Sequence, residues 1–264
     1  LCGNLRAAPD RCPQCGDTNV RYPGLGTEKV EAVVRGTFPH ATVARMDSDT
    51  MTRRDSYRKT LGEFRAGRIH ILIGTQMIAK GLHFPNVTLV GVVFADLSLH
   101  LPDFRAGERT FQLLTQVAGR AGRGEVPGHV VVQSYTPFNP ALQYALQHDV
   151  EGFRDEELEM RELMAFPPAS HMILIHFLGE SETSVAEFAT QFGEALKPDL
   201  PAGTAVVDPT PSPLAKARRK FRYQMALRTS QVRAISRLLR ERTLGRSMRE
   251  PVQVIVDVDP VSLL

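Results

Sequence analysis

Hydrophobic residues recur with two different periods in the first half of the chain. Between residues 20 and 135, segments with a helical period alternate with short, nearly continuous apolar runs. The helical segments predict a helix at 27–38, capped by Thr27, and a second one over Tyr57–Phe64, closed by Gly67. The apolar runs predict strands at 41–46, 70–73, 87–93 and 129–132. Because such strands, separated by helices, are typical of a parallel sheet buried on both faces, we predict a RecA-like or Rossmann-like α/β layer.

The pattern changes in the second half of the chain. Residues 137–161 look helical, and Phe166-Pro167-Pro168 is a rigid break that we interpret as a domain boundary. Beyond the break the patterns predict a strand, a helix, two strands, a helix and a strand, at 172–178, 183–196, 205–209, 221–228, 231–242 and 252–258. This βαββαβ order is that of the ferredoxin-like α+β fold. We therefore expect a RecA-like lobe at 20–165 and a ferredoxin-like domain at 166–264.

Composition narrows the class of protein. With 264 residues, 42% of them hydrophobic and 23% charged, the chain can bury the cores of two globular domains. No apolar run approaches the length of a membrane span and no signal peptide is recognisable, so we expect a cytoplasmic protein without a membrane partner. The chain starts at Leu1 without an initiator Met, and we interpret it as a fragment of a longer protein.

The cysteines lie at the beginning of the chain. Cys12 and Cys15 are separated by two residues and followed by Gly16, the arrangement in which two thiolates grip one zinc ion. Cys2 lies apart from them, and three thiolates leave a tetrahedral site incomplete. We predict a partial zinc-binding segment at 1–19, with free structural cysteines as the alternative.

Arginines and glycines alternate in the stretch from Gln116 to Gly124. In a helix, Gln116, Arg120 and Arg123 would share one face, at i, i+4 and i+7. Glycines such as Gly119 weaken a helix but let another body approach its backbone closely. Two guanidinium groups at fixed spacing suit a polyphosphate whose negative charge builds up in a transition state. The alternative is a solvated basic helix end.

A second candidate segment follows the strand at 70–73. Gly74 permits close backbone approach, Thr75 offers a hydroxyl and an amide, and Lys80 and His83 add donors at the carboxyl end of the sheet. Together with Gln76 and Gly81, they fit a loop that senses a nucleic-acid phosphate on one side and a nucleotide on the other. The alternative is an ordinary strand-to-helix loop with Thr75 as its cap.

Asp96 ends the next strand, where it could position an arginine, contact another lobe or cap a turn. Neither a Gly-x4-Gly-Lys-Ser/Thr loop nor an Asp-Glu-x-His box occurs in the sequence. The chain therefore has the arginine side of a nucleotide site without the side that holds the nucleotide, and its arginines need a partner lobe.

A basic and aromatic stretch lies at 216–223, with five cations and two aromatic rings in eight residues. Strand alternation would put Phe221 and Tyr223 on one face and Arg222 on the other. Such a stretch could contact DNA, a partner protein or the core of its own domain.

Several motifs, in this order, resemble the C-terminal half of the PriA family, the replication-restart DNA helicases of superfamily 2. They are Gly-Leu-Gly-Thr-Glu at 24–28, Ile-Gly-Thr-Gln-Met-Ile-Ala-Lys-Gly at 73–81 with His-Phe-Pro at 83–85, Pro-Asp-Phe-Arg-Ala-Gly-Glu-Arg-Thr-Phe at 102–111, Gln-Val-Ala-Gly-Arg-Ala-Gly-Arg at 116–123, and Asp-Val-Asp-Pro at 257–260. The resemblance covers essentially the whole chain.

This resemblance implies the second motor lobe of an ATP-dependent 3′-to-5′ DNA helicase, with 73–81 as motif V and 116–123 as motif VI. Gln116, Arg120 and Arg123 would act on ATP and Mg²⁺ held mainly by a first lobe. The family's two zinc sites use eight cysteines, of which Cys2, Cys12 and Cys15 match three, so neither site closes within this sequence. Implied partners are replication forks, D-loops, single strands, single-strand-binding protein and other primosome proteins in the nucleoid.

Two other readings stay open. A non-catalytic restart adaptor would hold DNA and proteins without a working motor, although motifs V and VI are intact here. A lobe of another superfamily 2 helicase is disfavoured by the cysteine pair and the ferredoxin-like tail. By itself, the 264-residue chain is expected to fold but to be inactive.

Overall fold

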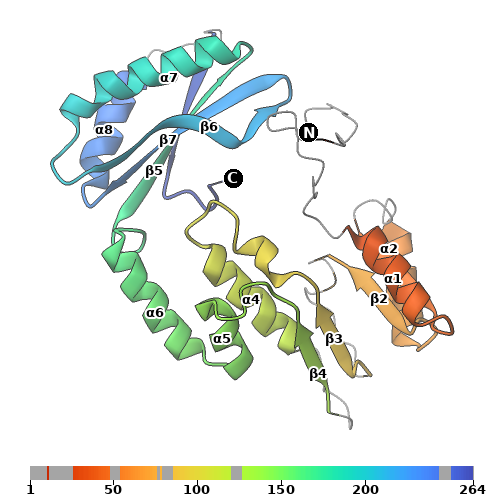
Figure 1. The fold of residues 1–264 in the computed structure, drawn as a ribbon. Helices are drawn as coiled ribbons and strands as arrows, with labels where there is room; N and C mark the ends of the chain where they lie inside the picture. The colour runs from red at the N-terminus through yellow and green to blue at the C-terminus, as the bar shows by residue number, and fades with distance from the viewer. Residues whose placement is uncertain are drawn as a thin grey trace. The chain divides into compact units, whose positions relative to one another are not determined.

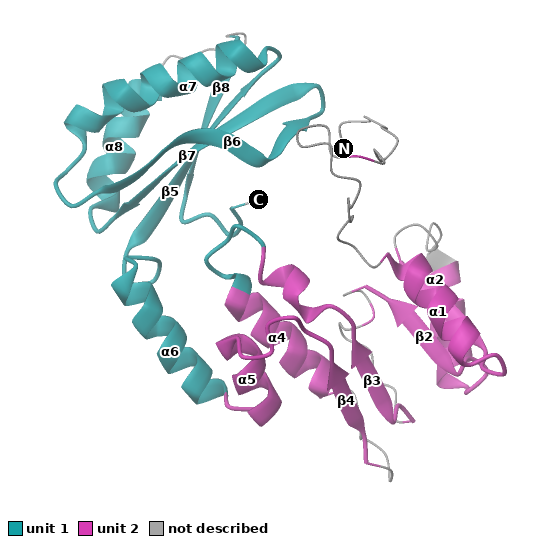
Figure 2. Ribbon diagram, viewed as in Figure 1, with its two compact units in different colours: residues 1–6, 101–106, 150–264 teal, residues 7–100, 107–149 magenta. Residues whose placement is uncertain are grey.

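A computed structural model of the chain describes residues 11, 26–47, 54–75, 78, 86–119, 127–243 and 251–263. The chain forms two units, shown in different colours in Figure 2. Unit 1 comprises 1–6, 101–106 and 150–264, and unit 2 comprises 7–100 and 107–149. In this division the helix that follows residue 149 belongs with the C-terminal sheet, and the domain boundary expected at 165/166 stays a prediction. No helix within the described ranges is long and apolar enough to cross a membrane.

Unit 2 alternates helices and short strands, as the hydrophobic pattern predicts. Its elements are α1 (Thr27–Thr37), β1 (Val43–Met46), α2 (Arg54–Arg65), β2 (Ile71–Gly74), β3 (Leu89–Val92), the 3₁₀ helix η1 (Ala95–Ser98), α4 (Ala106–Ala118, whose first residue belongs to unit 1), β4 (His129–Val132) and α5 (Pro140–Gln147). The expected strands are therefore present within a few residues of their predicted ends, and the mixed α/β class is confirmed.

The strands of unit 2 pair in parallel, as predicted. Strand β1 pairs with β2, and β3 with β4, as two separate two-stranded sheets within the described residues. The prediction of burial on both faces is wrong for the second pair, because Leu89 and Val131 are 63% and 59% exposed. Every second residue of β3 and β4 is exposed, which is the pattern of a strand covered on one face.

Helix ends in unit 2 show which local signals were informative. The N-cap of α1 is Gly26 and not Thr27, whose hydroxyl instead donates to Asp47 across to the end of β1. Gly67 closes α2 with φ 74°, and the Gly67 and Arg68 amides donate to the Phe64 and Glu63 carbonyls, the Schellman arrangement. The prediction for Thr27 is therefore corrected, and that for Gly67 is confirmed.

The helical stretch predicted at 137–161 is two helices, α5 and α6 (Val150–Leu163). They are separated at His148, which adopts a left-handed conformation with φ 55°. Asn139 caps α5 by accepting a hydrogen bond from the Ala141 amide at 3.0 Å, and Pro140 occupies the first helical position.

Unit 1 is built around a four-stranded antiparallel sheet (Figure 1). After α6 its elements are β5 (His171–Gly179), α7 (Glu182–Leu196), the 3₁₀ helix η2 (Lys197–Asp199), β6 (Ala205–Ala217), β7 (Lys220–Thr229), α8 (Val232–Thr243) and β8 (Val252–Val258). The sheet order is β6-β7-β5-β8. Both α7 and α8 cover one face, where alternate residues of β5 are fully buried together with residues of the two helices: Ile173, Ile175, Phe177, Val185, Ala189, Ile235 and Leu239.

Strand β6 lies at the edge of this sheet and is longer than the predicted 205–209. It contains Pro209, Pro211 and Pro213, which an edge strand tolerates because one side of its backbone has no ladder partner. Its register against β7 shifts between Val207 and Thr210 and again between Pro211 and Lys216. Prolines and bulges of this kind discourage the addition of another strand.

Candidate functional site

Gly74 is the last residue of β2, and the backbone of a neighbouring strand lies close to it. A Cβ atom there would lie 2.5 Å from the Met46 carbonyl oxygen of β1 and 3.0 Å from Cγ2 of Ile78. The approaching backbone is thus that of the neighbouring strand. Thr75 is exposed, and its carbonyl accepts the Ile78 amide at 3.1 Å. The other residues proposed for this segment, Gln76, Lys80, Gly81 and His83, lie outside the described residues.

Replacing Gly74 by alanine is expected to destabilise unit 2 by about 1–3 kcal/mol, because the new methyl group would overlap the Met46 carbonyl. Gly62 is a matched control, since it lies inside α2 and a methyl group added there would meet nothing within 4 Å. Gly62→Ala should instead stabilise by about 0.5–1 kcal/mol. Urea unfolding of the two variants checks whether the free energy of unfolding falls in Gly74→Ala and rises in Gly62→Ala. Equal changes in the two variants would contradict this account of Gly74.

Helix α4 leads to the arginine motif. Phe111, Leu114 and Val117 are buried, whereas Gln116 is exposed on another side of the helix. The helix ends at Ala118, and Gly119 stands in a turn, its amide donating to the Thr115 carbonyl at 3.1 Å. Gln116 is therefore helical as predicted, and Gly119 still makes a helix-like bond to the residue four positions before it, whereas the predicted continuation over 120–124 lies outside the described residues.

Arg120 and Arg123 lie outside the described residues. Their common helical face with Gln116 stays a prediction.

Asp96 caps a turn, one of the roles left open by the sequence. It is fully buried in η1, and its carboxylate accepts hydrogen bonds from the Ser134 hydroxyl at 2.8 Å and the Tyr135 and Thr136 amides at 2.9 Å. The Thr136 hydroxyl also donates to it. Burial alone would raise the pKa of Asp96, but these hydrogen bonds outweigh it and hold the pKa well below its ordinary value. The carboxylate thus joins the ends of β3 and β4.

The expected zinc ligands Cys2, Cys12 and Cys15 lie outside the described residues. Across the ranges that the structure does describe, no group of three His, Cys, Asp or Glu side chains is placed to hold a metal ion. The zinc prediction is therefore untested.

The basic and aromatic stretch at 216–223 is the end of the β6–β7 hairpin. Tyr223 packs against the core formed with α7 and α8, whereas Arg222, its neighbour in β7, points to the other face by strand alternation. Phe221 lies beneath the Lys216 ammonium, which is 4.1 Å from the centre of its ring. The strand predicted at 221–228 is confirmed and Tyr223 packs against the core, whereas the common face of Phe221 and Tyr223 stays a prediction.

The structure also joins two motifs that the sequence left apart, 102–106 and 257–260, both in unit 1. The Arg105 guanidinium donates to the Pro260 carbonyl at 2.8 Å, 155 residues away in the sequence. The buried Asp103 carboxylate accepts the Arg105 amide at 3.0 Å and the Leu263 amide at 3.3 Å. These contacts fix the short segment 101–106 to the end of the chain.

Aromatic contacts hold the same segment on its other side. The Phe104 ring stacks on Phe166 with 5.0 Å between centroids, and the Arg105 and Arg161 guanidiniums lie 4.1 and 5.1 Å from its centre. No local pattern predicts such pairings, because their partners are distant in sequence. In the sequence this segment stands out only as part of the motif at 102–111 shared with the family, and that motif does not indicate which residues the segment contacts.

Asp259 is the residue before Pro260, whose carbonyl accepts the hydrogen bond from Arg105. Its carboxylate accepts the Met172 amide at 3.0 Å and contacts Nδ1 of His171 at 2.8 Å. Burial would raise the pKa of Asp259, but the bonds to His171 and Met172 lower it overall.

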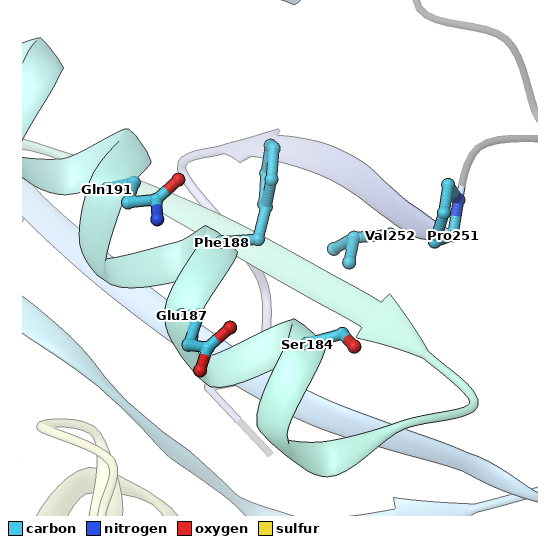
Figure 3. Close-up of a pocket in the computed structure, with 6 residues that line it drawn as sticks. All are labelled: Ser184, Glu187, Phe188, Gln191, Pro251 and Val252. Carbon is cyan, nitrogen blue, oxygen red and sulfur yellow. The ribbon is translucent and has the colours of Figure 1, made fainter.

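A shallow pocket of about 280 Å³ lies on unit 1, between α7 and the start of β8 (Figure 3). Its lining is Ser184, Glu187, Phe188, Gln191, Pro251 and Val252. None of the residues singled out from the sequence lines it, and its single carboxylate has no second ionisable partner in the lining.

Comparison with known proteins matches both parts of the chain. The Helicase conserved C-terminal domain matches residues 26–125, and the Primosomal protein N C-terminal domain matches residues 162–261. The replication restart protein PriA of Bacillus subtilis (strain 168) is 41% identical over 267 residues, covering 100% of this chain and 33% of the relative. PriA of Treponema pallidum (strain Nichols) is 39% identical, covering 100% of this chain and 40% of the relative.

The same protein of Haemophilus influenzae (strain ATCC 51907 / DSM 11121 / KW20 / Rd) is 37% identical, covering 99% of this chain and 36% of the relative. The chain thus spans about a third of the length of these curated relatives. The two domain matches and the identity along the whole chain agree with each other. The chain belongs to the PriA family and corresponds to the C-terminal part of its members.

Proposed function

We propose that the chain supplies the second motor lobe and the C-terminal domain of an ATP-dependent 3′-to-5′ DNA helicase that restarts replication at stalled forks. The observation that carries the proposal is the helicase domain match at 26–125, which contains both the segment at 73–81 and the arginine motif at 116–123. The names of the relatives, replication restart protein PriA, support the biological role.

The division of labour follows from the residues present. Arg120 and Arg123 carry the guanidiniums that stabilise negative charge on the transferring phosphoryl group, and Gln116 is the third residue that we propose to take part in catalysis. ATP supplies the reacting phosphate, and its Mg²⁺ is held mainly by a first lobe, because no phosphate-binding loop occurs in this sequence. Gly74, Thr75, Gln76, Lys80, Gly81 and Gly119 are the residues that we propose to bind the nucleotide.

The remaining parts of the proposal concern binding. Cys2, Cys12 and Cys15 are thiolate donors of the type that zinc prefers, and they hold zinc together with cysteines outside this sequence. The order β6-β7-β5-β8 supports a ferredoxin-like class for the C-terminal domain. The partners are fork DNA, D-loops, single strands, single-strand-binding protein and other primosome proteins, in the nucleoid of the cytoplasm.

The decisive experiment measures DNA-stimulated ATP hydrolysis by the complete protein that contains this chain, beside the 264-residue chain alone. We expect activity in the complete protein and none in the chain, because the chain lacks a phosphate-binding loop. Strand-displacement assays on substrates with opposite single-stranded tails then test the polarity. If the complete protein binds fork DNA but hydrolyses no ATP, the motor assignment fails and a non-catalytic adaptor is the better account.

A further inference from the structure

We propose that the end of the β6–β7 hairpin binds the phosphate backbone of DNA through a set of five cations that we name the cationic hairpin: Lys216, Arg218, Arg219, Lys220 and Arg222. The proposal rests on the proposed function in one respect, namely that DNA is the ligand. It adds a binding surface on the C-terminal domain, separate in sequence from both helicase motifs.

The tip of the hairpin extends beyond the rest of the sheet. Ala217 pairs with Lys220, and Arg218 and Arg219 form the two-residue connection between them. The neighbouring strand β5 ends at Gly179, opposite Phe221. At about 3.3 Å per residue, the tip lies roughly 7–10 Å past that pair. Both tip arginines are exposed, so their guanidiniums are accessible to a ligand.

The charges of the cationic hairpin are not neutralised by carboxylates in the part of the chain that is described. Lys220 donates to the neutral Gln253 amide oxygen at 2.8 Å, and Lys216 lies over the ring of Phe221. No ion pair forms between a described carboxylate and either tip arginine. Five like charges in eight residues repel one another, which favours an anionic ligand.

Arg222 adds a further indication. Its Nε atom is buried and has no hydrogen-bond partner among the described residues. The pKa of the nearby His176 is lowered, first by burial and then by the positive charge of Arg222, although Asp257 acts in the opposite direction. The positive charge of Arg222 therefore acts on His176, on the face of the sheet that α7 and α8 do not cover.

The backbone of the tip is unusual for arginine. Arg218 and Arg219 have φ values of 50° and 66°, and positive φ at both central residues is the requirement of a type I′ turn. Such turns favour Asn-Gly, because most side chains are disfavoured at positive φ. Two arginines therefore occupy the positions where Asn and Gly are preferred in this type of turn. This indicates that their side chains serve binding.

Phosphate is the ligand that the side chains fit best. Neither aromatic ring of the stretch is free to stack on bases, because Tyr223 packs against the core and Phe221 lies under Lys216. Arginine forks match the geometry of phosphate oxygens, whereas tight binding of a peptide relies on buried apolar anchors. The contact should thus be electrostatic and independent of base sequence.

The test is the double variant Arg218→Asn/Arg219→Gly in the complete protein. Asn-Gly is the preferred sequence of this turn, so the variant should fold with equal or higher thermal stability while losing two cations. We expect affinity for single-stranded and duplex DNA to fall about tenfold at 50 mM salt and little at 200 mM, with the salt dependence of log K reduced by about 2.

The matched control is Arg233→Gln/Arg237→Gln, which removes the same charge from the exposed side of α8. The proposal holds if the hairpin variant weakens DNA binding and the control does not. Equal losses would assign the effect to net charge and overturn it, as would unchanged DNA affinity. Loss of binding to an acidic protein with unchanged DNA affinity would also overturn it, in favour of a protein partner.

The DNA-affinity measurements are independent of the ATP hydrolysis assay that tests the motor proposal. DNA affinity can depend on the cationic hairpin in a protein that hydrolyses no ATP, in which case the hairpin stands and the motor proposal fails. Conversely, DNA-stimulated ATP hydrolysis with unchanged DNA affinity in the hairpin variant would retain the motor and overturn the hairpin.

Discussion

Replacing Arg123 by alanine in the complete protein is expected to lower DNA-stimulated ATP hydrolysis by about 10³–10⁵-fold and to leave DNA affinity nearly unchanged. The physical reason is that a guanidinium directed at the transferring phosphoryl group stabilises charge that develops only in the transition state. Its loss should therefore appear in kcat much more than in the binding of nucleotide or DNA. Steady-state ATP hydrolysis at saturating DNA, with DNA affinity measured separately, checks both parts.

Arg123→Lys separates charge from shape. Lysine keeps the positive charge but lacks the planar fork, so most of the loss seen with alanine should remain. Arg65→Ala is the control, because Arg65 is an exposed arginine in the last turn of α2 and should be dispensable for hydrolysis. Wild-type hydrolysis by Arg123→Ala would remove the arginine from the reaction and leave Arg120 to be tested in the same way.

Elements marked by local signals were predicted well. Strand β8 occupies the predicted 252–258, and Gly67 ends α2 as its conformational freedom suggests. Errors occurred where the decisive contact is not local or the signal is ambiguous. His148 divides α5 from α6 with positive φ, although it is not glycine, and the prolines of β6 resemble strand breakers until its edge position is known.

The candidate site shows the same limit. Gly74 was predicted to let a ligand approach the backbone, which stays a prediction, whereas the group that the structure places against it is the Met46 carbonyl, which the sequence did not show. The pairing of Arg105 with Pro260 joins residues 155 positions apart, and no periodicity encodes such a distance. Asp96 had three possible roles in the sequence, and only the fold, by bringing residues 134–136 to its carboxylate, identified a cap.

Asp96→Ala is the second large effect that we expect, a destabilisation of unit 2 by about 2–4 kcal/mol. The substitution removes the acceptor shared by the Tyr135 and Thr136 amides and two hydroxyls, at a position where Asp96 itself is fully buried, although the Thr136 amide keeps the Ser134 hydroxyl as a second acceptor at 2.9 Å. A hydrogen bond to a charged group contributes about 1.5–3 kcal/mol, and water can replace part of this loss because Tyr135 and Thr136 are exposed. Urea unfolding gives the total, and hydrogen exchange at the Tyr135 and Thr136 amides locates it. Glu28→Gln, at an 82% exposed side chain in the same unit, removes only a surface ion pair with Arg45, so it should cost less than about 1 kcal/mol and leave the exchange of the two amides unchanged.

The pH dependence tests the ionised state of the same carboxylate. Because the pKa of Asp96 is lowered by folding, its contribution to stability is complete above the pKa of an unfolded aspartate, about 3.9, and is lost as the pH falls through the lower pKa of the folded state. Asp96→Asn has no such charge, so its deficit relative to the wild type should be largest near pH 7 and should shrink below about pH 4. A constant deficit across that range would mean that the hydrogen bonds from Ser134, Tyr135 and Thr136 do not depend on a carboxylate, and the stabilisation would then come from shape alone.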